Sequence, residues 1–231
     1  MTLIGRSKLS AVIFDVETVG EDFENLDETS QEYFLKYAES QKEKEDAKIS
    51  TSFYPLTAKV VAIAMLEVES EKGCVYFQND GKEKEKLTEG GITYISGTEP
   101  EILQHFWKQI DRYPQFITFN GRTFDCPFLM IRSAVHHIKA SKNLSPYRYA
   151  HNIHIDLADQ LSFYDALRRK FGLHMWCKAF GVESPKESGI TGFDVKELYS
   201  KGRYHDIARY CMADVQAAKK LYQYWEKYLK F

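Results

Sequence analysis

The chain has 231 residues, of which 44% are hydrophobic and 28% charged, a balance typical of a globular protein with a sizeable core. No apolar run approaches the roughly 20 residues that a membrane-spanning helix needs, and the start of the chain lacks the apolar segment of a secretory signal. The four cysteines are scattered without a C-x-x-C pair, which indicates reduced thiols in a cytoplasmic protein rather than disulfides or a zinc site.

The net charge of −2 conceals an uneven distribution along the chain. Residues 21–50 hold ten acidic and four basic side chains, a balance of −6, so the rest of the chain carries +4. Between Cys126 and Ile155 there is no acidic residue at all, and the bases there are Arg132, Lys139, Lys142 and Arg148. This stretch indicates either a basic face for a polyanion such as nucleic acid or an ordinary solvated surface.

The first half of the chain reads mainly as β-structure. A strand rich in β-branched and aromatic residues is expected at 9–20, followed by an acidic surface helix within 21–50. Further strands are expected at 58–70 and 73–80, and the short gap between them indicates a hairpin. The charged segment 81–91 is interpreted as a loop.

The second half alternates helices and strands. A helix is expected at 98–113, since Thr98 is a good N-cap and Pro100 fits the first turn. The remaining expected elements are a strand at 115–121, a helix at 124–137, a short strand entering a helix at 151–163, short helices and loops at 164–203, and a long amphipathic helix at 203–230. This order predicts an α/β fold with a mixed five-stranded sheet and helices on both faces. We expect a single domain over 1–231, with the acidic helical segment at about 21–50 as an insertion.

Two acids continue an apolar row of the first strand. Side chains alternate between the faces of a strand, so Asp15 and Glu17 share a face with Ile13. Two carboxylates about 6–7 Å apart at a half-buried strand end repel each other and lose hydration. A cation between them removes that cost, whereas the alternative is a strand that simply emerges into water.

The last helix places a third acid in an apolar stripe. Asp214 has apolar residues one turn before and after it, and a buried carboxylate demands a partner. No Lys or Arg shares the middle of the stripe, so the partner is either a cation or a salt bridge from another element. Tyr210 lies one turn earlier, so its phenol points to the same place.

A fourth acid, Asp125, follows the strand at 115–121 and opens the next helix. An acid there often only complements the helix dipole, but ligands of α/β sheets gather at the carboxyl ends of such strands. Four carboxylates converging on one sheet edge suit Mg²⁺ or Mn²⁺, and two such ions can activate attack on a phosphodiester.

Two further clusters are weaker. His151, His154 and Asp156 have a spacing that fits metal ligation, but His151 falls on the opposite strand face from the other two. Arg168, Arg169 and Lys170 can contact phosphates or form a solvated face.

Taken together, FDVET, NGRTFDCPFL and YCMAD resemble, in order and spacing, the three exonuclease motifs of the DEDD superfamily, which has a ribonuclease H-like fold. Tyr210 and Asp214 match its tyrosine branch, since the histidine branch would place His where this chain has Arg209. The second motif is most similar to standalone bacterial 3′–5′ exonucleases related to the proofreading domain of family B DNA polymerases. The resemblance spans roughly residues 9–228, and the acidic segment 21–50 is the main departure.

The resemblance implies a role for each matching residue. Asp15, Glu17 and Asp214 would hold one ion, Asp15 would bridge to a second, and Asp125 would act directly or through water. Tyr210 would orient the attacking water. Thr18 and Val19 would contact the terminal nucleotide, and Asn120 and Phe124 would guide the strand.

The resemblance therefore predicts a metal-dependent exonuclease that releases mononucleotides from the 3′ ends of single-stranded DNA, in repair or proofreading. Two alternatives stay open, an exoribonuclease and a catalytically silent nucleic-acid-binding module on the same fold. A proofreading role would require a separate polymerase or repair protein as partner.

Overall fold

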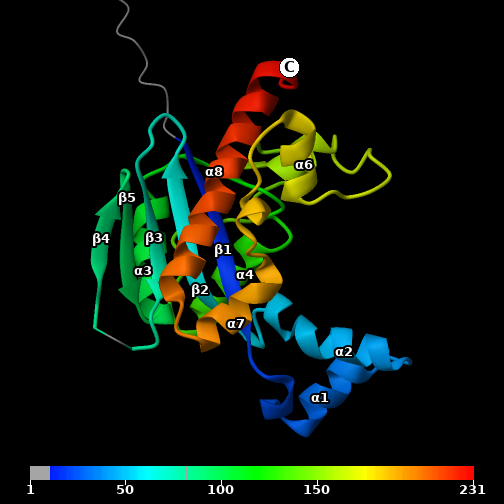
Figure 1. Ribbon diagram of the computed structural model, residues 1–231. Coiled ribbons are helices and arrows are strands. Elements are labelled where there is room, and N and C mark those ends of the chain that lie inside the picture. The colour runs from blue at the N-terminus through cyan, green and yellow to red at the C-terminus, as the bar shows by residue number, and fades with distance from the viewer. Residues whose placement is uncertain (1–10, 82) are drawn as a thin grey trace, which may run out of the picture.

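The computed structural model describes residues 11–81 and 83–231, and within them a single mixed sheet of seven strands forms the centre of the fold (Figure 1). The strands are β1 (Ala11–Gly20), β2 (Ala58–Glu67), β3 (Gly73–Gln78), β4 (Lys86–Glu89), β5 (Ile92–Gly97), β6 (Gln115–Thr118) and β7 (His154–Asp156). Their spatial order is β4-β5-β3-β2-β1-β6-β7. The expected hairpin between β2 and β3 is confirmed, and β6 pairs with β1 in parallel.

The prediction of five strands was wrong, because β4 and β5 were missed. β4 lies in the segment interpreted as a charged loop, and all four of its residues are exposed, so it has no apolar pattern to reveal it. Its pairing with β5 depends on Gly90 and Gly91, whose φ angles of 56° and 86° are the left-handed values that a two-residue hairpin turn requires. β5 does alternate between buried and partly buried residues, so its omission was a missed signal, whereas β4 has no such pattern.

Helices cover both faces of the sheet, as predicted (Figure 1). The helices on one face are α3 (Glu99–Ile110) and α4 (Asp125–Val135). Those on the other are α5 (Leu157–Leu161), α6 (Leu173–Phe180), α7 (Val195–Ser200) and α8 (Tyr204–Tyr228). Of these, α8 is the long amphipathic helix expected from the sequence, and it packs along β1, β2 and β3. None of the helices in the described part of the chain is long and apolar enough to span a membrane.

β1 is buried on both faces, which is why it can position polar groups rigidly. Phe14 packs with Phe106 of α3, with ring centroids 5.3 Å apart. On the other face Ala11 and Ile13 contribute to the core beneath α8. The face that carries Asp15 is therefore the α8 face, in the centre of the molecule.

The acidic segment after β1 forms two helices rather than the single helix that was predicted. It begins with the 3-10 turn η1 (Phe23–Asn25) and continues through α1 (Glu28–Leu35) and α2 (Gln41–Ile49) to a second 3-10 turn, η2 (Ser50–Phe53). Neither α1 nor α2 has a buried residue, and both project from the body of the protein below α7 (Figure 1). Ser40 caps α2 by accepting from the Glu43 N–H, and this cap separates the two helices.

Candidate active site

The two acids of β1 lie side by side in the interior. Glu17 is only 9% exposed and Asp15 is partly buried. Burial raises the pKa of both carboxyls well above the ordinary values, and the neighbouring carboxylates raise them further. The first strand therefore carries two acids that are costly to ionise unless a positive charge joins them.

Asp125 is held against the same strand. It is the first residue of α4, is 3% exposed, and accepts a hydrogen bond of 3.0 Å from the Val16 N–H. Burial raises its pKa to about 7, although the Val16 hydrogen bond acts in the opposite direction. Because this bond joins the start of α4 to β1, the second motif is fixed relative to the first.

Asp214 approaches from α8, together with Tyr210. Burial raises the pKa of Asp214 to about 6, while a hydrogen bond from the Tyr210 phenol and the charge of Lys186 lower it. Burial and the neighbouring Asp214 also raise the pKa of Tyr210, so the phenol stays protonated. The one-turn spacing that predicted a shared direction for these two side chains is confirmed by this contact.

Cys211 is part of the cluster, although no sequence signal pointed to it. Its sulfur lies 3.9 Å from Asp15 Oδ2, and one ligand atom each from Asp15, Glu17 and Cys211 fall within 4.8 Å of one another. Burial and the adjacent carboxylates raise the pKa of the thiol well above its ordinary value. Without a bound ion, the neutral thiol of Cys211 is a weak hydrogen-bond donor to Asp15.

The side chains from the three motifs line one cleft of about 340 Å³. The residues predicted from sequence that line it are Asp15, Glu17, Thr18, Asn120, Phe124, Asp125, Tyr210 and Asp214. Val19 does not line it: its side chain is 7% exposed, belongs to the core and borders a separate depression. The structure thus brings eight of the nine predicted positions together.

The cleft also has lining residues that sequence reasoning missed. Ser52 and Phe53 come from η2, Lys186 comes from the 3-10 turn η3 (Pro185–Ser188), and Gly192 comes from the 3-10 turn η4 (Gly192–Asp194). Among the described lining residues, Lys186 is the only cation. These residues lie in irregular segments without periodicity, and only the chain path between elements places them at the acids.

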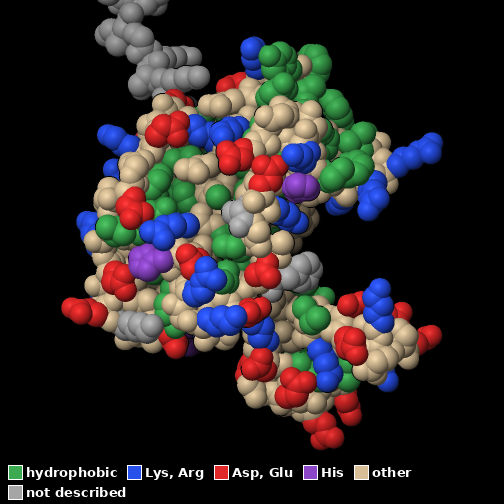
Figure 2. Space-filling view, viewed as in Figure 1, with side chains coloured by type: hydrophobic (Ala, Val, Ile, Leu, Met, Phe, Trp, Pro, Cys, Tyr) green, Lys and Arg blue, Asp and Glu red, His purple; other side chains and the backbone are tan. Residues whose placement is uncertain are grey.

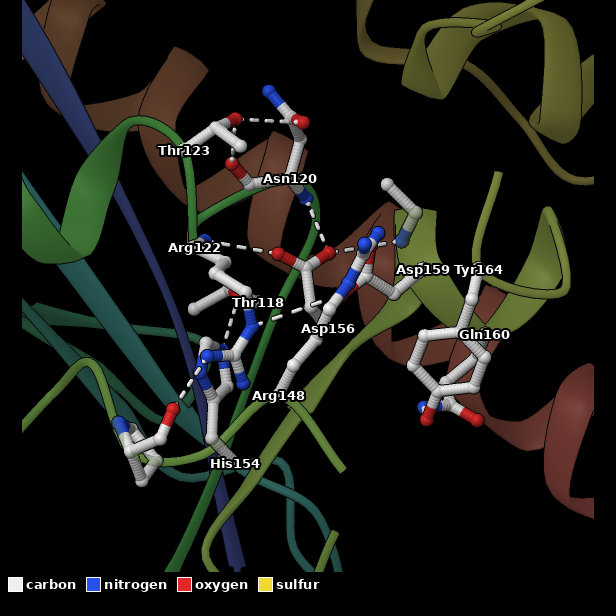
Figure 3. Close-up of polar contacts among 12 residues, drawn as sticks. Thr118, Asn120, Arg122, Thr123, Arg148, His154, Asp156, Asp159, Gln160 and Tyr164 are labelled. Atoms are coloured by element: carbon white, nitrogen blue, oxygen red, sulfur yellow. Dashed lines mark hydrogen bonds and ion pairs between the residues drawn. The ribbon is translucent and has the colours of Figure 1, made fainter. Parts of the chain in front are cut away.

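Asp156 organises the loop of the second motif from below (Figure 3). Its carboxylate accepts from the backbone N–H groups of Asn120 at 2.8 Å and Arg122 at 2.9 Å, and it also caps α5 by accepting from Ala158 N–H. Asn120 has a φ of 62°, a left-handed conformation that these bonds help to hold. Asp156 therefore positions the turn that leads to Asp125.

The spacing of His151, His154 and Asp156 does not correspond to a metal site in the structure. His154 Nε2 pairs with Thr118 Oγ1 at 2.8 Å, and burial lowers the pKa of His154 to about 3, so the ring is neutral. His151 instead contacts the hydroxyl of Tyr164. The three side chains are committed to three different partners.

The donor set of the cleft fits divalent metal ions. Four carboxylates face one small space, and burial makes each of them costly to ionise, so the site needs positive charge that Lys186 alone does not provide. Oxygen ligands are those that Mg²⁺ and Mn²⁺ prefer, and four carboxylates outnumber the single thiol at the cluster. Asp15, Glu17, Asp125 and Asp214 are the residues that would hold such ions.

The fold and the cleft together define an α/β protein with an acidic active site. Residues 51–229 match a family model described as a predicted 3′–5′ exonuclease related to the exonuclease domain of PolB. The chain belongs to this family of 3′–5′ exonucleases, as the motifs implied. The match includes Asp125, Tyr210 and Asp214, whereas Asp15 and Glu17 lie before it and are assigned to the site by their geometry.

A solved structure supports the same fold. The family B DNA polymerase from the hyperthermophilic archaeon Pyrobaculum calidifontis is similar with a TM-score of 0.59 and 16% sequence identity. The similarity covers 95% of this chain but 25% of the polymerase chain, and at this identity it establishes the fold alone. The expected α/β fold with a mixed sheet and helices on both faces is confirmed, with seven strands in place of five. No curated protein sequence matches the chain.

Proposed function

We propose that this exonuclease hydrolyses single-stranded DNA from the 3′ end and releases mononucleotides by a two-metal mechanism. The observation that carries the proposal is the meeting of Asp15, Glu17, Asp125 and Asp214 in one cleft, although they are distant in the chain. A catalytically silent module has no need to bear the cost of four buried like charges.

The four acids, Asp15, Glu17, Asp125 and Asp214, would hold two Mg²⁺ or Mn²⁺ ions. When bound, such ions lower the pKa of water and neutralise the charge that develops on the phosphate. The role of the protein is to fix the ligands, and the Val16 N–H to Asp125 bond and the burial of Glu17 do this before substrate arrives.

Tyr210 would orient the attacking water rather than take its proton. Its raised pKa keeps the phenol neutral at physiological pH, so it is a poor general base. Its hydroxyl donates to Asp214 and retains lone pairs that can accept from water. Lys186 also faces the cleft, where its ammonium can contact the phosphate.

The substrate contacts follow from the positions of the lining residues. Thr18 would contact the terminal nucleotide, and Asn120 and Phe124 would guide the strand, with the Phe124 ring available for stacking. The side chain of Val19 faces the core, so the contact expected from Val19 stays a prediction that only its backbone can fulfil.

The test is digestion of 5′-labelled single-stranded DNA and matched RNA with Mg²⁺, Mn²⁺ or excess chelator. We expect stepwise shortening from the 3′ end with either ion and none in chelator, and preference for DNA over RNA. Asp15→Ala should remove most of the activity. A wild-type rate that persists in chelator would refute the mechanism, and faster digestion of RNA would replace the proposed substrate by RNA.

The wider setting is also proposed. Residues 1–231 would act as one exonuclease domain, with the acidic helical segment at about 21–50 as an insertion. The four free cysteines suit a cytoplasmic protein. A role in proofreading or repair would need a separate polymerase or repair protein as partner, which co-purification can identify.

A further inference from the structure

The active-site cleft has two sides of different chemical character. One side is formed by Ser52 and Phe53 of η2, at the end of the acidic insertion. The other side is formed by Phe119 and Asn120, and these two residues also line a second depression of about 430 Å³. A strand that extends beyond the reacting nucleotide must leave the cleft along one of these sides.

The η2 side is anchored to β1. Thr18 Oγ1 donates to the Ser52 carbonyl at 2.8 Å, and the Gly20 N–H donates to Ser52 Oγ at 2.9 Å. The contact is so close that a Cβ atom on Gly20 would lie 2.4 Å from the Ser52 nitrogen. Beyond η2 lies the insertion 21–50, with ten acidic and four basic residues, so a polyanion meets repulsion in this direction.

The opposite side combines cations with aromatic rings. The second depression is lined by the cations Arg122, Arg148 and Lys170 and the rings of Phe171 and Trp176, together with three carboxylates, Asp156, Asp159 and Asp165. Phe171 is 38% exposed and lies edge-on to Trp176, with ring centroids 6.4 Å apart. Exposed rings beside cations are the features with which proteins bind single-stranded nucleic acid without sequence preference.

The cations nearest the sheet are already neutralised, and in the outer loop Lys170 pairs with Asp165 at 3.4 Å, whereas Arg168 and Arg169 have no such pair among the described residues. Arg148 pairs with Asp159 and Asp165, and Arg122 Nε lies 3.6 Å from Asp159. Arg168 and Arg169 are exposed, and within the described residues neither has a carboxylate in ion-pair range. The charge available to a phosphate is therefore at the tip of the loop between α5 and α6.

The shape of the molecule agrees with this difference. In Figure 2, Lys and Arg side chains extend from the loop between α5 and α6, and acidic side chains gather on the insertion below, with an open gap between the two. The loop begins with Phe163, Tyr164 and Asp165, all in the left-handed region with φ of 50°, 57° and 68°. Tyr164 is held there by a 2.8 Å hydrogen bond from Gln160 Nε2, so the outward direction of the loop is fixed at its base.

We infer that the nucleotides preceding the 3′-terminal one leave the cleft over Asn120 and Phe119 and bind along the loop between α5 and α6. Phe171 stacks on a base, and Arg168 and Arg169 contact phosphates. The inference rests on the proposed function for its substrate class, a single nucleic-acid strand. The alternative is an ordinary solvated loop that does not bind the strand. In that case the loop substitutions would not change how affinity and kcat/KM depend on strand length.

Binding and hydrolysis test the inference separately. Binding of a 5′-labelled oligo(dT) of about twelve nucleotides is measured by fluorescence anisotropy in chelator, where the proposed hydrolysis does not compete. The variants are Arg168→Ala/Arg169→Ala and Phe171→Ala. The matched control is Lys42→Ala/Lys44→Ala, which removes two exposed cations from α2. Thermal melting of each variant monitors folding.

We expect about tenfold weaker binding for each of the two loop variants and wild-type binding for the control. The arginine variant should also lower the salt dependence of binding by about one phosphate contact or more. In hydrolysis, kcat/KM for a twelve-nucleotide strand is divided by kcat/KM for a dinucleotide. In both loop variants this ratio should be about tenfold lower than in the wild-type enzyme. Wild-type affinity of the loop variants, or an equal loss in the control, would overturn the inference. Absence of any hydrolysis by the wild-type enzyme would instead overturn the proposed function, and the binding result would still decide the path.

Discussion

Replacing Asp214 by Asn should stabilise the metal-free protein while it weakens metal binding and removes most of the hydrolysis. Asp214 shares the cleft with three other carboxylates, and its pKa is raised from 3.8 to about 6. A carboxyl whose pKa is higher in the folded than in the unfolded chain destabilises the folded state. The effect begins above the unfolded pKa and is complete above the folded pKa. Asn keeps an oxygen that accepts from Tyr210 and removes the charge.

The size of the effect follows from the pKa. A shift of roughly two units corresponds to about 3 kcal/mol, since one unit is about 1.4 kcal/mol. This is an upper value, because Asn still buries a polar group. We therefore expect the free energy of unfolding at pH 8 in chelator to rise by about 1–3 kcal/mol. The sign depends on pH: near pH 4 Asp214 is protonated in the folded protein, so the gain should disappear.

Urea unfolding in chelator at both pH values, repeated with Mg²⁺ at pH 8, measures the effect. The wild-type protein should gain stability from Mg²⁺, and Asp214→Asn should gain little. Glu45→Gln removes one charge from the exposed helix α2 and should change stability by less than about 0.5 kcal/mol. A destabilised Asp214→Asn variant at pH 8, or one with undiminished stabilisation by Mg²⁺, would refute the account of the cleft.

Three further outcomes are expected. Tyr210→Phe should lower kcat about 10- to 100-fold with little change in KM, because the phenol orients water without binding the strand. Asp15→Ala should lose more activity, and an equal loss of activity in the two variants would contradict the role given to Tyr210. The rise in melting temperature on adding Mn²⁺ should be larger at pH 8 than at pH 6. Burial raises the pKa of Asp214 to about 6 and that of Asp125 to about 7, and the ionised carboxylates bind the ion. A larger rise at pH 6 would argue against these ligands. Asp156→Ala should lower the free energy of unfolding by about 2–4 kcal/mol and also reduce activity, because it leaves the N–H groups of Asn120 and Arg122 without their acceptor. Full activity in a destabilised variant would show that the loop keeps its shape without Asp156.

The strands and helices that were predicted correctly are those whose burial follows a regular period. β1 is buried on both faces, so its sequence is an almost continuous apolar run, and α8 is buried along one stripe, so its apolar residues recur along one helical face. The exposed strand β4 and the division of the acidic segment at Ser40 have no such pattern, since a hairpin partner and a helix cap determine them. Sequence periodicity reports burial, and it is silent where nothing is buried.

The sequence by itself determined that Asp15, Glu17 and Asp214 interrupt apolar patterns, and from this it predicted an acidic cluster with a cation as partner. Only the tertiary structure decided which other groups face them. Lys186, Cys211 and Phe53 reach the cleft through loop paths and a helix register that depend on contacts between distant segments. Those contacts form only when the chain has folded, because local preferences fix the conformation of an element but not its neighbours in space.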